Sequence, residues 1–311
     1  MKKTLVFFCM LFSFPLYAQQ FSVSAGAGLF NGKVNEYVFD ETCANTDNKV
    51  SELNWLINNT ALFNIDAACY LFNDFFFKAD FNIAVPKAAK NMIDLDWLDN
   101  SNPFERTNFS EHPCDFTNYF SIEAALGKKI NIGNFFTLEP FGAFSFDYIE
   151  FNSHDGYKIY KSDNYEKIRM YGKIIDYSQL TFSFFTGCNA ILYDDNFCGI
   201  LSFAMSPFLS WCDCYDLHWQ RNPPLYFNDE VYFSFRLKLS LELDYYFCKN
   251  NALCFFMNLD FLPRNKGQSL TAAYNDKLDR YSQEWHVSYS EGGTDRLFTT
   301  FSLNYKYIFG K

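Results

Sequence analysis

The amino-acid sequence predicts an all-β fold, a ten-stranded antiparallel transmembrane β-barrel with long extracellular loops. Three observations lead to this prediction. Aromatic residues make up 21% of the 311 residues and charged residues only 20%, and aromatic side chains favour half-buried, pleated strands. Apolar and polar residues alternate over segments longer than the strands of most soluble proteins. Short turns and long polar connections also alternate along the chain, as they do at the two rims of outer-membrane barrels.

Residues 1–18, MKKTLVFFCMLFSFPLYA, are typical of a signal peptide. Two lysines supply the positive charge, an apolar stretch follows, and Ala18 suits the position before the cleaved bond. We therefore expect an exported protein in which residues 19–311 form a single outer-membrane β-barrel domain. Beyond the signal peptide the sequence has no apolar run of 18 or more residues, so no second membrane helix is predicted.

Two segments show the alternation most clearly. In residues 230–246, EVYFSFRLKLSLELDYY, every odd position from Val231 to Tyr245 is apolar or aromatic, and the even positions are mostly polar or charged. A soluble β-sandwich would bury the apolar face, whereas a membrane barrel turns it towards lipid and encloses the polar face. Residues 297–309, LFTTFSLNYKYIF, favour the barrel, because an amphipathic C-terminal strand ending in an aromatic residue resembles the assembly signal of bacterial outer-membrane barrels.

Eight further segments complete the ten predicted strands. They cover residues 21–38, 50–72, 75–87, 115–131, 135–152, 173–193, 197–216 and 253–263. Short connections lie at 72–75, 131–134, 193–196 and 248–252, and long polar connections at 39–49, 88–114, 153–172, 217–229 and 264–294. An even number of strands places both ends of the barrel domain on the periplasmic side with the short turns, so the long loops face the outside of the cell.

Two pairs of titratable residues lie in or beside the long loops. Asp94 and Asp96, in NMIDLDWLDNSNP, are two positions apart and share a face wherever the chain is extended. Two carboxylates side by side repel each other unless a proton, a metal ion or a hydrogen-bonding partner relieves the repulsion. Asp216 and His218, in WCDCYDLHW, have the same spacing, and a carboxylate beside an imidazole fixes its tautomer and prepares it as a general base. Solvated loop charges, or a calcium site at Asp94, Asp96 and Asp99, are the alternatives to a catalytic site.

Several motifs, in the same order along the chain, resemble those of the omptins, a family of aspartyl-type endopeptidases of the outer membrane. They are GKVNEYVFD (32–40), VSELNWLINNTAL (50–62), NMIDLDWLDNSNP (91–103), EHPCDFTNYFSIE (111–123), DLH (216–218) and FTTFSLNYKY (298–307). The stretch DLDW in the third motif is specific to this pattern. The fold that the resemblance implies, a ten-stranded barrel protruding above the membrane, agrees with the strand count obtained from the alternation.

The resemblance also implies the residues of the site. Asp94 and Asp96 match the aspartate couple of the family, and Asp216 and His218 match its Asp–His pair. A water molecule held between the two pairs would attack the peptide bond, and neither a covalent intermediate nor a metal ion or cofactor is implied. Glu36 matches a carboxylate of the pocket for a basic P1 side chain, P1 being the substrate residue before the cleaved bond. The formal charge of −10 also favours basic polypeptide substrates.

The chain departs from the family pattern at two places. Cys214 stands where relatives carry a second acidic residue of the P1 pocket, so the sequence predicts a weaker preference for basic P1 residues. Tyr148 and Leu180 stand where relatives carry arginines that bind lipopolysaccharide, which counts against a dependence on this lipid. Of the ten cysteines, Cys9 lies in the signal peptide, and several of the others lie in apolar segments as expected for small buried side chains.

Other functions fit parts of the sequence. A non-catalytic barrel acting as an adhesin or surface binding protein would contain the same strands, but it would have no need of all four catalytic residues. A porin is disfavoured because ten strands enclose a narrow interior that side chains fill. The expected partners are polypeptide substrates and outer-membrane lipid, and no nucleic-acid partner is expected.

Overall fold

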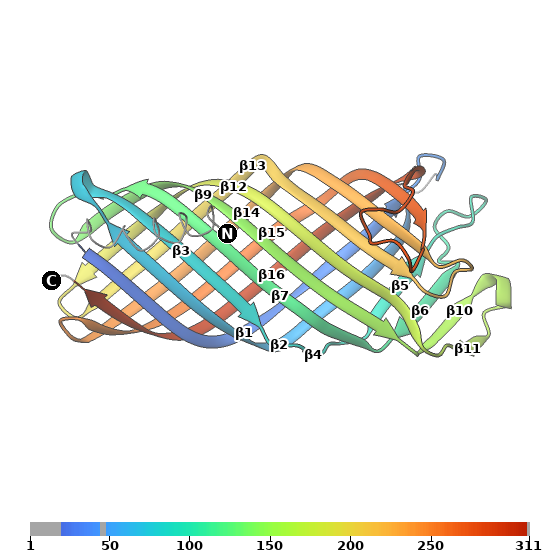
Figure 1. Ribbon diagram of the computed structural model, residues 1–311, viewed down its shortest axis with the longest axis horizontal. Coiled ribbons are helices and arrows are strands. Elements are labelled where there is room, and N and C mark those ends of the chain that lie inside the picture. Colours follow the sequence, from blue (N-terminus) through green and yellow to red (C-terminus); the bar gives the residue numbers. More distant parts are fainter. Residues whose placement is uncertain (1–19, 44–47, 310–311) are drawn as a thin grey trace.

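The computed structural model describes residues 20–43 and 48–309, and the predicted signal peptide lies outside this part of the chain. Ten long antiparallel strands form a closed ring (Figure 1). They are β1 (Gln20–Phe39), β2 (Lys49–Tyr70), β3 (Phe75–Ala84), β7 (Cys114–Lys128), β9 (Phe136–His154), β12 (Lys173–Asp194), β13 (Phe197–His218), β14 (Leu225–Cys248), β15 (Asn251–Ala273) and β16 (His286–Phe309). β1 pairs with β2 on one side and with β16 on the other, where Phe21 lies opposite Phe309. The sheet therefore closes on itself, and the predicted fold class is confirmed.

The two ends of the barrel differ (Figure 1). Where β1 begins and β16 ends, short turns join the strands, and they include the 3-10 turn η2 (Phe72–Asp74) and the short strand β8 (Ile130–Asn131). The connections at the other end, which we call the loop rim, carry five short strands: β4 (Lys87–Ala88), β5 (Met92–Asp96), β6 (Asn108–His112), β10 (Tyr157–Tyr160) and β11 (Lys167–Arg169). β5, β6, β10 and β11 pair one after another beyond β2, so they extend the barrel wall above the ring.

β15 and β16 are longer than the alternation predicts, and they reach far into the connection assigned to residues 264–294. Only residues 274–285 separate the two strands. The added strand residues, such as RNKGQSL in β15 and SYSEGG in β16, do not alternate between apolar and polar types. Period-2 alternation arises only where one face of a strand is apolar, so it gives no signal in strand segments that are polar on both faces.

The alternation along β14 shifts by one residue near the loop rim. Phe233 has a positive φ of 58° and 65% of its surface exposed. Val231 and Ser234, on either side of Tyr232 and Phe233, are both fully buried, and the register with β13 slips between these positions. A bulge of this kind inserts one residue and reverses the alternation beyond it. The prediction that Val231 shares a face with the odd positions up to Tyr245 is therefore wrong, because Val231 points inwards.

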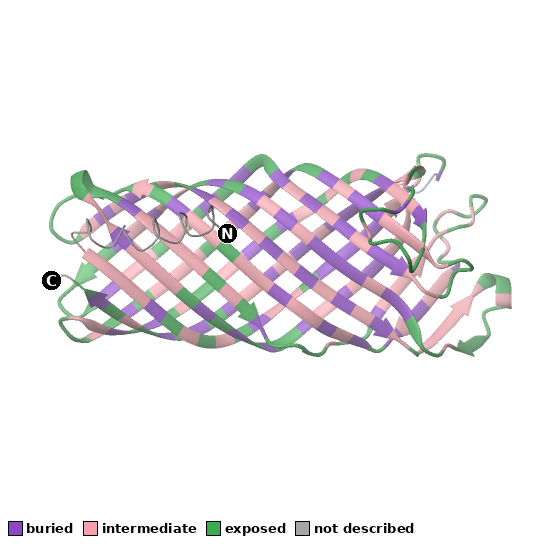
Figure 2. Cartoon of the chain, viewed as in Figure 1, coloured by how far each residue is buried: buried purple, intermediate pink, exposed green. Residues whose placement is uncertain are grey.

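Along the middle of the strands, buried residues alternate with more exposed ones (Figure 2). The exposed positions are mainly large apolar side chains: Phe63, Ile65, Phe81, Ile83, Ile122, Leu126, Leu201, Phe203, Leu239, Leu243, Phe255, Phe301 and Leu303. An apolar surface of this extent needs a partner, and a ring of strands presents it on all sides, as a lipid bilayer requires. Among the described residues, no helix is long and apolar enough to cross a membrane.

The barrel is taller than a membrane. β14 and β16 each have 24 residues, whereas about 9–11 residues of a tilted strand cross the hydrocarbon core. Towards the loop rim the outer face becomes polar: Tyr37 donates a hydrogen bond of 2.7 Å to Asp295, and Arg264 stacks 4.3 Å from the Tyr37 ring. Asp213 and Glu230 lie opposite each other on β13 and β14 at the start of this polar zone. The strand ends beyond these residues therefore stand outside the membrane.

Side chains fill the barrel beneath the loop rim. Trp55 stacks on Tyr177 and Phe151, with ring centroids 5.2 and 5.4 Å apart, and all three belong to one buried apolar cluster. This cluster contacts a buried ionic network through Phe298, which lies 4.9 Å from the guanidinium of Arg296. An interior packed in this way is typical of a small barrel and not of an open channel.

The ionic network is built from four charged residues that are at most 5% exposed: Asp147, Arg236, Asp260 and Arg296. Arg236 donates to Asp147 over 2.8 Å and to Asp260 over 2.6 and 2.9 Å. Arg296 donates two hydrogen bonds to Asp147, one of them 3.0 Å long. Two guanidinium groups thus balance two carboxylates, which limits the cost of burying these charges.

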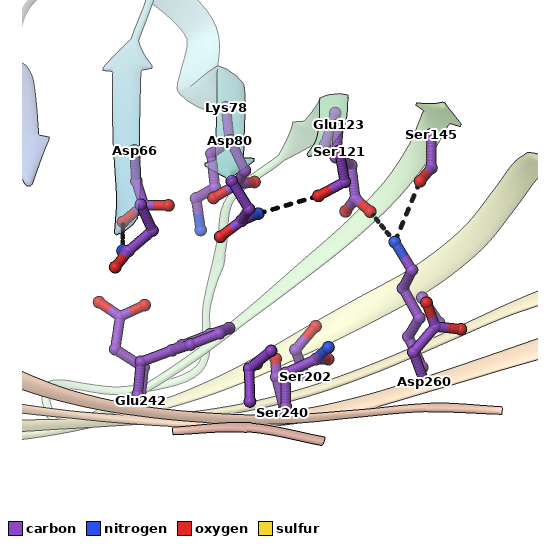
Figure 3. Close-up of a pocket in the computed structure, with 18 of the residues that line it drawn as sticks. Asp66, Lys78, Asp80, Ser121, Glu123, Ser145, Ser202, Ser240, Glu242 and Asp260 are labelled. Carbon is purple, nitrogen blue, oxygen red and sulfur yellow. Dashed lines mark hydrogen bonds and ion pairs between the residues drawn. The ribbon is translucent and has the colours of Figure 1, made fainter. Parts of the chain in front are cut away.

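A polar cavity of about 170 Å³ borders this network inside the barrel (Figure 3). Glu123 and Ser145 both accept hydrogen bonds from Lys238, and Ser121 accepts one of 3.2 Å from Asn82. Such a polar interior beside an apolar exterior is the arrangement found in membrane barrels.

We expect the protein to behave as a membrane barrel in detergent. Closed barrels resist unfolding by cold detergent because every strand is paired, so unboiled and boiled samples should migrate differently in electrophoresis. The circular dichroism spectrum of the unboiled protein should be of the β type. Recovery of folded protein in a soluble periplasmic fraction would contradict this expectation.

Candidate active site

The DLDW motif lies on β5, in the wall that rises above the ring. β5 pairs with β2 and β6, and Asp94 lies opposite Leu53 and Ser110 in these strands. Because β5 is an extended strand, Asp94 and Asp96 point to the same side of the sheet, as the spacing predicts. The sheet thereby turns two carboxyl groups of one loop towards the axis of the barrel.

β6 supplies polar partners for the aspartate couple. Asn108 donates a hydrogen bond of 3.0 Å to Asp96, and Ser110 donates a long one of 3.5 Å to Asp94. Burial and, second, the nearby charge of Asp96 raise the pKa of Asp94 well above its usual range, although the positive charge of Arg221 opposes this shift. This shift favours the protonated form of Asp94, and a proton on the couple would relieve the repulsion between the two carboxyl groups.

Asp216 and His218 lie at the loop-rim end of β13 and share its inner face. The Nε2 atom of His218 lies 2.5 Å from the Asp216 carboxylate. The Asp216 side chain is 3% exposed and that of His218 is 19% exposed. The His218 ring also packs edge-on against Phe227, with the ring centroids 5.1 Å apart. The carboxylate thus holds the proton on Nε2 and leaves the Nδ1 lone pair free to accept a proton.

A single cleft at the loop rim brings these pairs together. It has a volume of about 420 Å³, within the usual range of ligand sites. Asp94, Asp96, Asp216, His218 and Glu36 all line it. Five of the six residues singled out in the sequence therefore meet in one cavity, although they come from β1, β5 and β13.

Glu36 lies on the inner face of β1 at one side of the cleft. It is 3% exposed, and its Oε2 atom has no hydrogen-bond partner among the described residues. Burial raises the pKa of Glu36 well above its usual range, and the charges of Asp216 and Asp229 add to this effect. A buried carboxyl group with a vacant acceptor and acidic neighbours is suited to a cationic ligand group.

The model of the omptin family matches residues 17–309, nearly the whole chain. The chain belongs to the omptin family. The plasminogen activator of Yersinia pestis is 32% identical to this chain over 99 residues, which make up 32% of this chain and 30% of that protein. The match thus spans less than a third of the relative's length.

The fold of this omptin also matches a solved structure. The outer membrane protease OmpT from Escherichia coli matches with a TM-score of 0.83 and 18% sequence identity, over 93% of this chain and 97% of that chain. At this level of identity, the likeness shows a shared fold.

The omptin's Cys214 does not line the cleft. It is 2% exposed, and its sulfur accepts a hydrogen bond of 3.5 Å from Gln179. The Cys212 sulfur lies 3.7 Å away, and both thiols are free. Thr294, which also accepts a hydrogen bond from Gln179, belongs to the same buried layer. The role of Cys214 in the P1 pocket therefore remains a prediction, and the structure puts the thiol beneath the cavity.

Several residues that the sequence reasoning did not single out also line the omptin cleft, among them Tyr160, Arg221 and Asp229. Asp229 is 3% exposed and sits directly opposite Cys214 in the pairing of β13 with β14. No short motif marks any of the three. The signal that could have identified Asp229 is the alternation of β14, but the bulge at Phe233 reverses it before it reaches residue 229.

Two groups of acidic residues of the omptin bear on metal binding. Asp99, the third residue of the alternative calcium site, pairs with Lys161 over 2.6 Å, so Asp94 and Asp96 lack its support. Inside the barrel, Glu242, Asp244 and Cys254 lie close enough to share an ion. The ammonium group of Lys306 already pairs with Glu242 and Asp244. A lysine thus supplies the positive charge that this second group needs.

Proposed function

We propose that this chain is an outer-membrane endopeptidase of omptin type, with its cleft on the extracellular side, that hydrolyses peptide bonds near basic residues. The observation that carries the proposal is the meeting of an aspartate couple and an Asp–His pair in one cleft at the loop rim. Neither pair is distinctive alone, but a general base and a proton-bearing carboxyl couple in one cavity are the groups that hydrolysis by an activated water requires.

In the proposed mechanism, a water molecule lies between His218 and the aspartate couple. His218 accepts one proton from this water at Nδ1 as the oxygen attacks the carbonyl carbon of the peptide. Asp216, bonded to Nε2, orients the ring and stabilises the imidazolium that forms. The imidazolium then gives its proton to the leaving nitrogen as the carbon–nitrogen bond breaks, so the site returns to its starting state.

The aspartate couple orients the water. In this mechanism the couple carries a single proton, placed on Asp94 because burial raises the pKa of that carboxyl group, so that one oxygen donates a hydrogen bond to the water while Asp96 accepts one. Asn108 fixes Asp96 by its hydrogen bond of 3.0 Å. Ordered donors and acceptors around the water lower the cost of reaching the attacking geometry.

The acidic cleft supports a preference for basic substrates. Glu36 offers a buried carboxyl group to a Lys or Arg side chain, and the formal charge of −10 favours the approach of basic peptides.

The outer face of the barrel bears on the lipids that the protein binds. Tyr148 pairs with Leu180 across β9 and β12, so neither position offers a positive charge for the phosphates of lipopolysaccharide. We propose that activity does not depend on this lipid.

Chelation of divalent metal ions should leave peptide cleavage unchanged, because the proposed site contains no metal. Refolded protein is assayed on a basic peptide with and without EDTA, beside a sample to which calcium is returned. Equal rates are expected in all three samples. A loss of activity with EDTA that calcium restores would favour the calcium-stabilised loop and contradict the proposed mechanism.

A further inference from the structure

Besides the aspartate couple, three carboxyl groups meet in the cleft. Glu36 comes from β1, Asp216 from β13 and Asp229 from β14, and each is 3% exposed. The side chains of Glu36 and Asp216 are within hydrogen-bonding reach of each other, and Asp229 is close enough to Asp216 for the charge of Asp216 to raise the pKa of Asp229. Buried carboxyl groups need a positive partner or a proton, and this cluster opens into the cleft.

Asp229 lies where it can replace an acid that this chain lacks. Its register partner on β13 is Cys214, the position at which the family pattern expects an acidic residue. Directly paired residues of neighbouring antiparallel strands have Cβ atoms about 4.5–5.5 Å apart. A carboxyl group on β14 can therefore reach the same part of the cleft as one on β13. Asp213, the other acid near Cys214, points to the outer face beside Tyr232 and Arg280.

The surroundings of Asp229 hold its carboxyl group in one place. It accepts hydrogen bonds from the Ser269 hydroxyl and from the backbone N–H of Gly293. A Cβ atom at Gly292 would lie 2.0–2.3 Å from the Asp229 carboxyl atoms, so only glycine leaves room for this side chain. Burial and the charge of Asp216 raise the pKa of Asp229 to about 8. A cation in the cleft would displace the proton and pair with a carboxylate that is already oriented.

We infer that Asp229 is a specificity-determining residue of this chain: together with Glu36 it binds the basic P1 side chain, and it replaces the acid that is missing at Cys214. This inference rests on the proposed function. Two neighbouring carboxyl groups from different strands, β1 and β14, suit the fork of an arginine side chain. From Cys214 alone, the sequence predicts a weaker preference for basic P1 residues. Asp229 on β14 would compensate for this loss.

The test compares two peptides that differ only at P1, one with arginine and one with citrulline, its uncharged isostere. The wild-type protein should prefer arginine, and Asp229→Asn should reduce this preference in kcat/KM by about ten- to a hundred-fold through the loss of a charge-assisted contact. The loss should fall on the arginine peptide, while cleavage of the citrulline peptide stays near the wild-type rate.

Asp213→Asn is the matched control. Asp213 lies on the outer face of the barrel, next to the register partner of Asp229, and its replacement removes the same type of side chain without changing the cleft. This variant should keep the wild-type preference for arginine. Gly292→Ala is the second variant: it preserves the net charge, displaces the Asp229 carboxyl group, and should also reduce the preference. An unchanged preference in folded Asp229→Asn or Gly292→Ala, or an equal loss in Asp213→Asn, would overturn the inference. Failure of the folded wild-type protein to cut either peptide would instead contradict the proposed function.

Discussion

Replacing His218 by alanine should lower kcat for peptide cleavage by about a hundred- to ten-thousand-fold, the usual cost of removing a general base. His218 is the only described histidine that lines the cleft beside the aspartate couple with a carboxylate on its second nitrogen. Asp96→Asn should cause a loss of similar size, because an amide cannot accept the hydrogen bond of the water in the same way. Both variants should keep the electrophoretic shift of the folded barrel.

His154→Ala is the control for this experiment. His154 also lies at the loop rim beside two carboxylates, Asp155 at 2.9 Å and Asp115 at 3.6 Å, but its side chain is 42% exposed and does not line the cleft. Its replacement should leave kcat unchanged. Full activity of folded His218→Ala would exclude the general-base role and with it the proposed mechanism.

Asp147→Ala should destabilise the barrel by about 3–5 kcal/mol, the typical cost of removing one partner from a buried ion pair. Asp147 accepts hydrogen bonds from both Arg236 and Arg296, and all three residues are at most 1% exposed. Without it, two buried guanidinium groups would have only Asp260 to balance them. Unfolding in guanidinium chloride, followed by the loss of the electrophoretic shift in detergent, measures the change.

Lys161→Ala is the control for stability. Lys161 pairs with Asp99 and Glu105 at 2.6 and 2.9 Å, so it forms as many ion pairs as Arg236, but it lies on the surface of the loop rim. Exposed pairs of this kind contribute little to stability, so the unfolding midpoint should not move. An equal effect of the two substitutions would show that burial does not govern the strength of these ion pairs.

Much of the fold follows from the sequence because a lipid-facing barrel must alternate. Where one face of a strand meets lipid, every second residue is apolar, and the predicted bounds of β12 and β13 lie within two residues of the observed ones. Above the membrane both faces meet water, so the ends of β15 and β16 could not be predicted. The bulge at Phe233 could not be predicted either. The residues around it are aromatic on both faces of the strand, so the sequence pattern does not show where the faces exchange.

The candidate site depended on different information. The spacing of Asp94 and Asp96 predicts a shared face, but only the pairing of β5 with β2 turns that face into the cleft. The resemblance of the motifs to the omptins connected them with Asp216 and His218, which lie more than a hundred residues further along the chain. Asp229 belongs to no motif, and its position depends on the register of β14 with β13. Contacts between distant strands of this kind are not encoded in any single segment.

The cleavage profile of a random peptide library tests the central claim most directly, because it examines the cleft as a peptidase site without assuming a substrate. Refolded wild-type protein is incubated with the library in EDTA, beside folded His218→Ala, and the new peptide termini are identified by mass spectrometry. We expect cuts that cluster next to lysine and arginine in the wild-type sample and are absent from the variant. A folded wild-type protein that produces no cuts, or a variant that produces the same cuts, would contradict the claim.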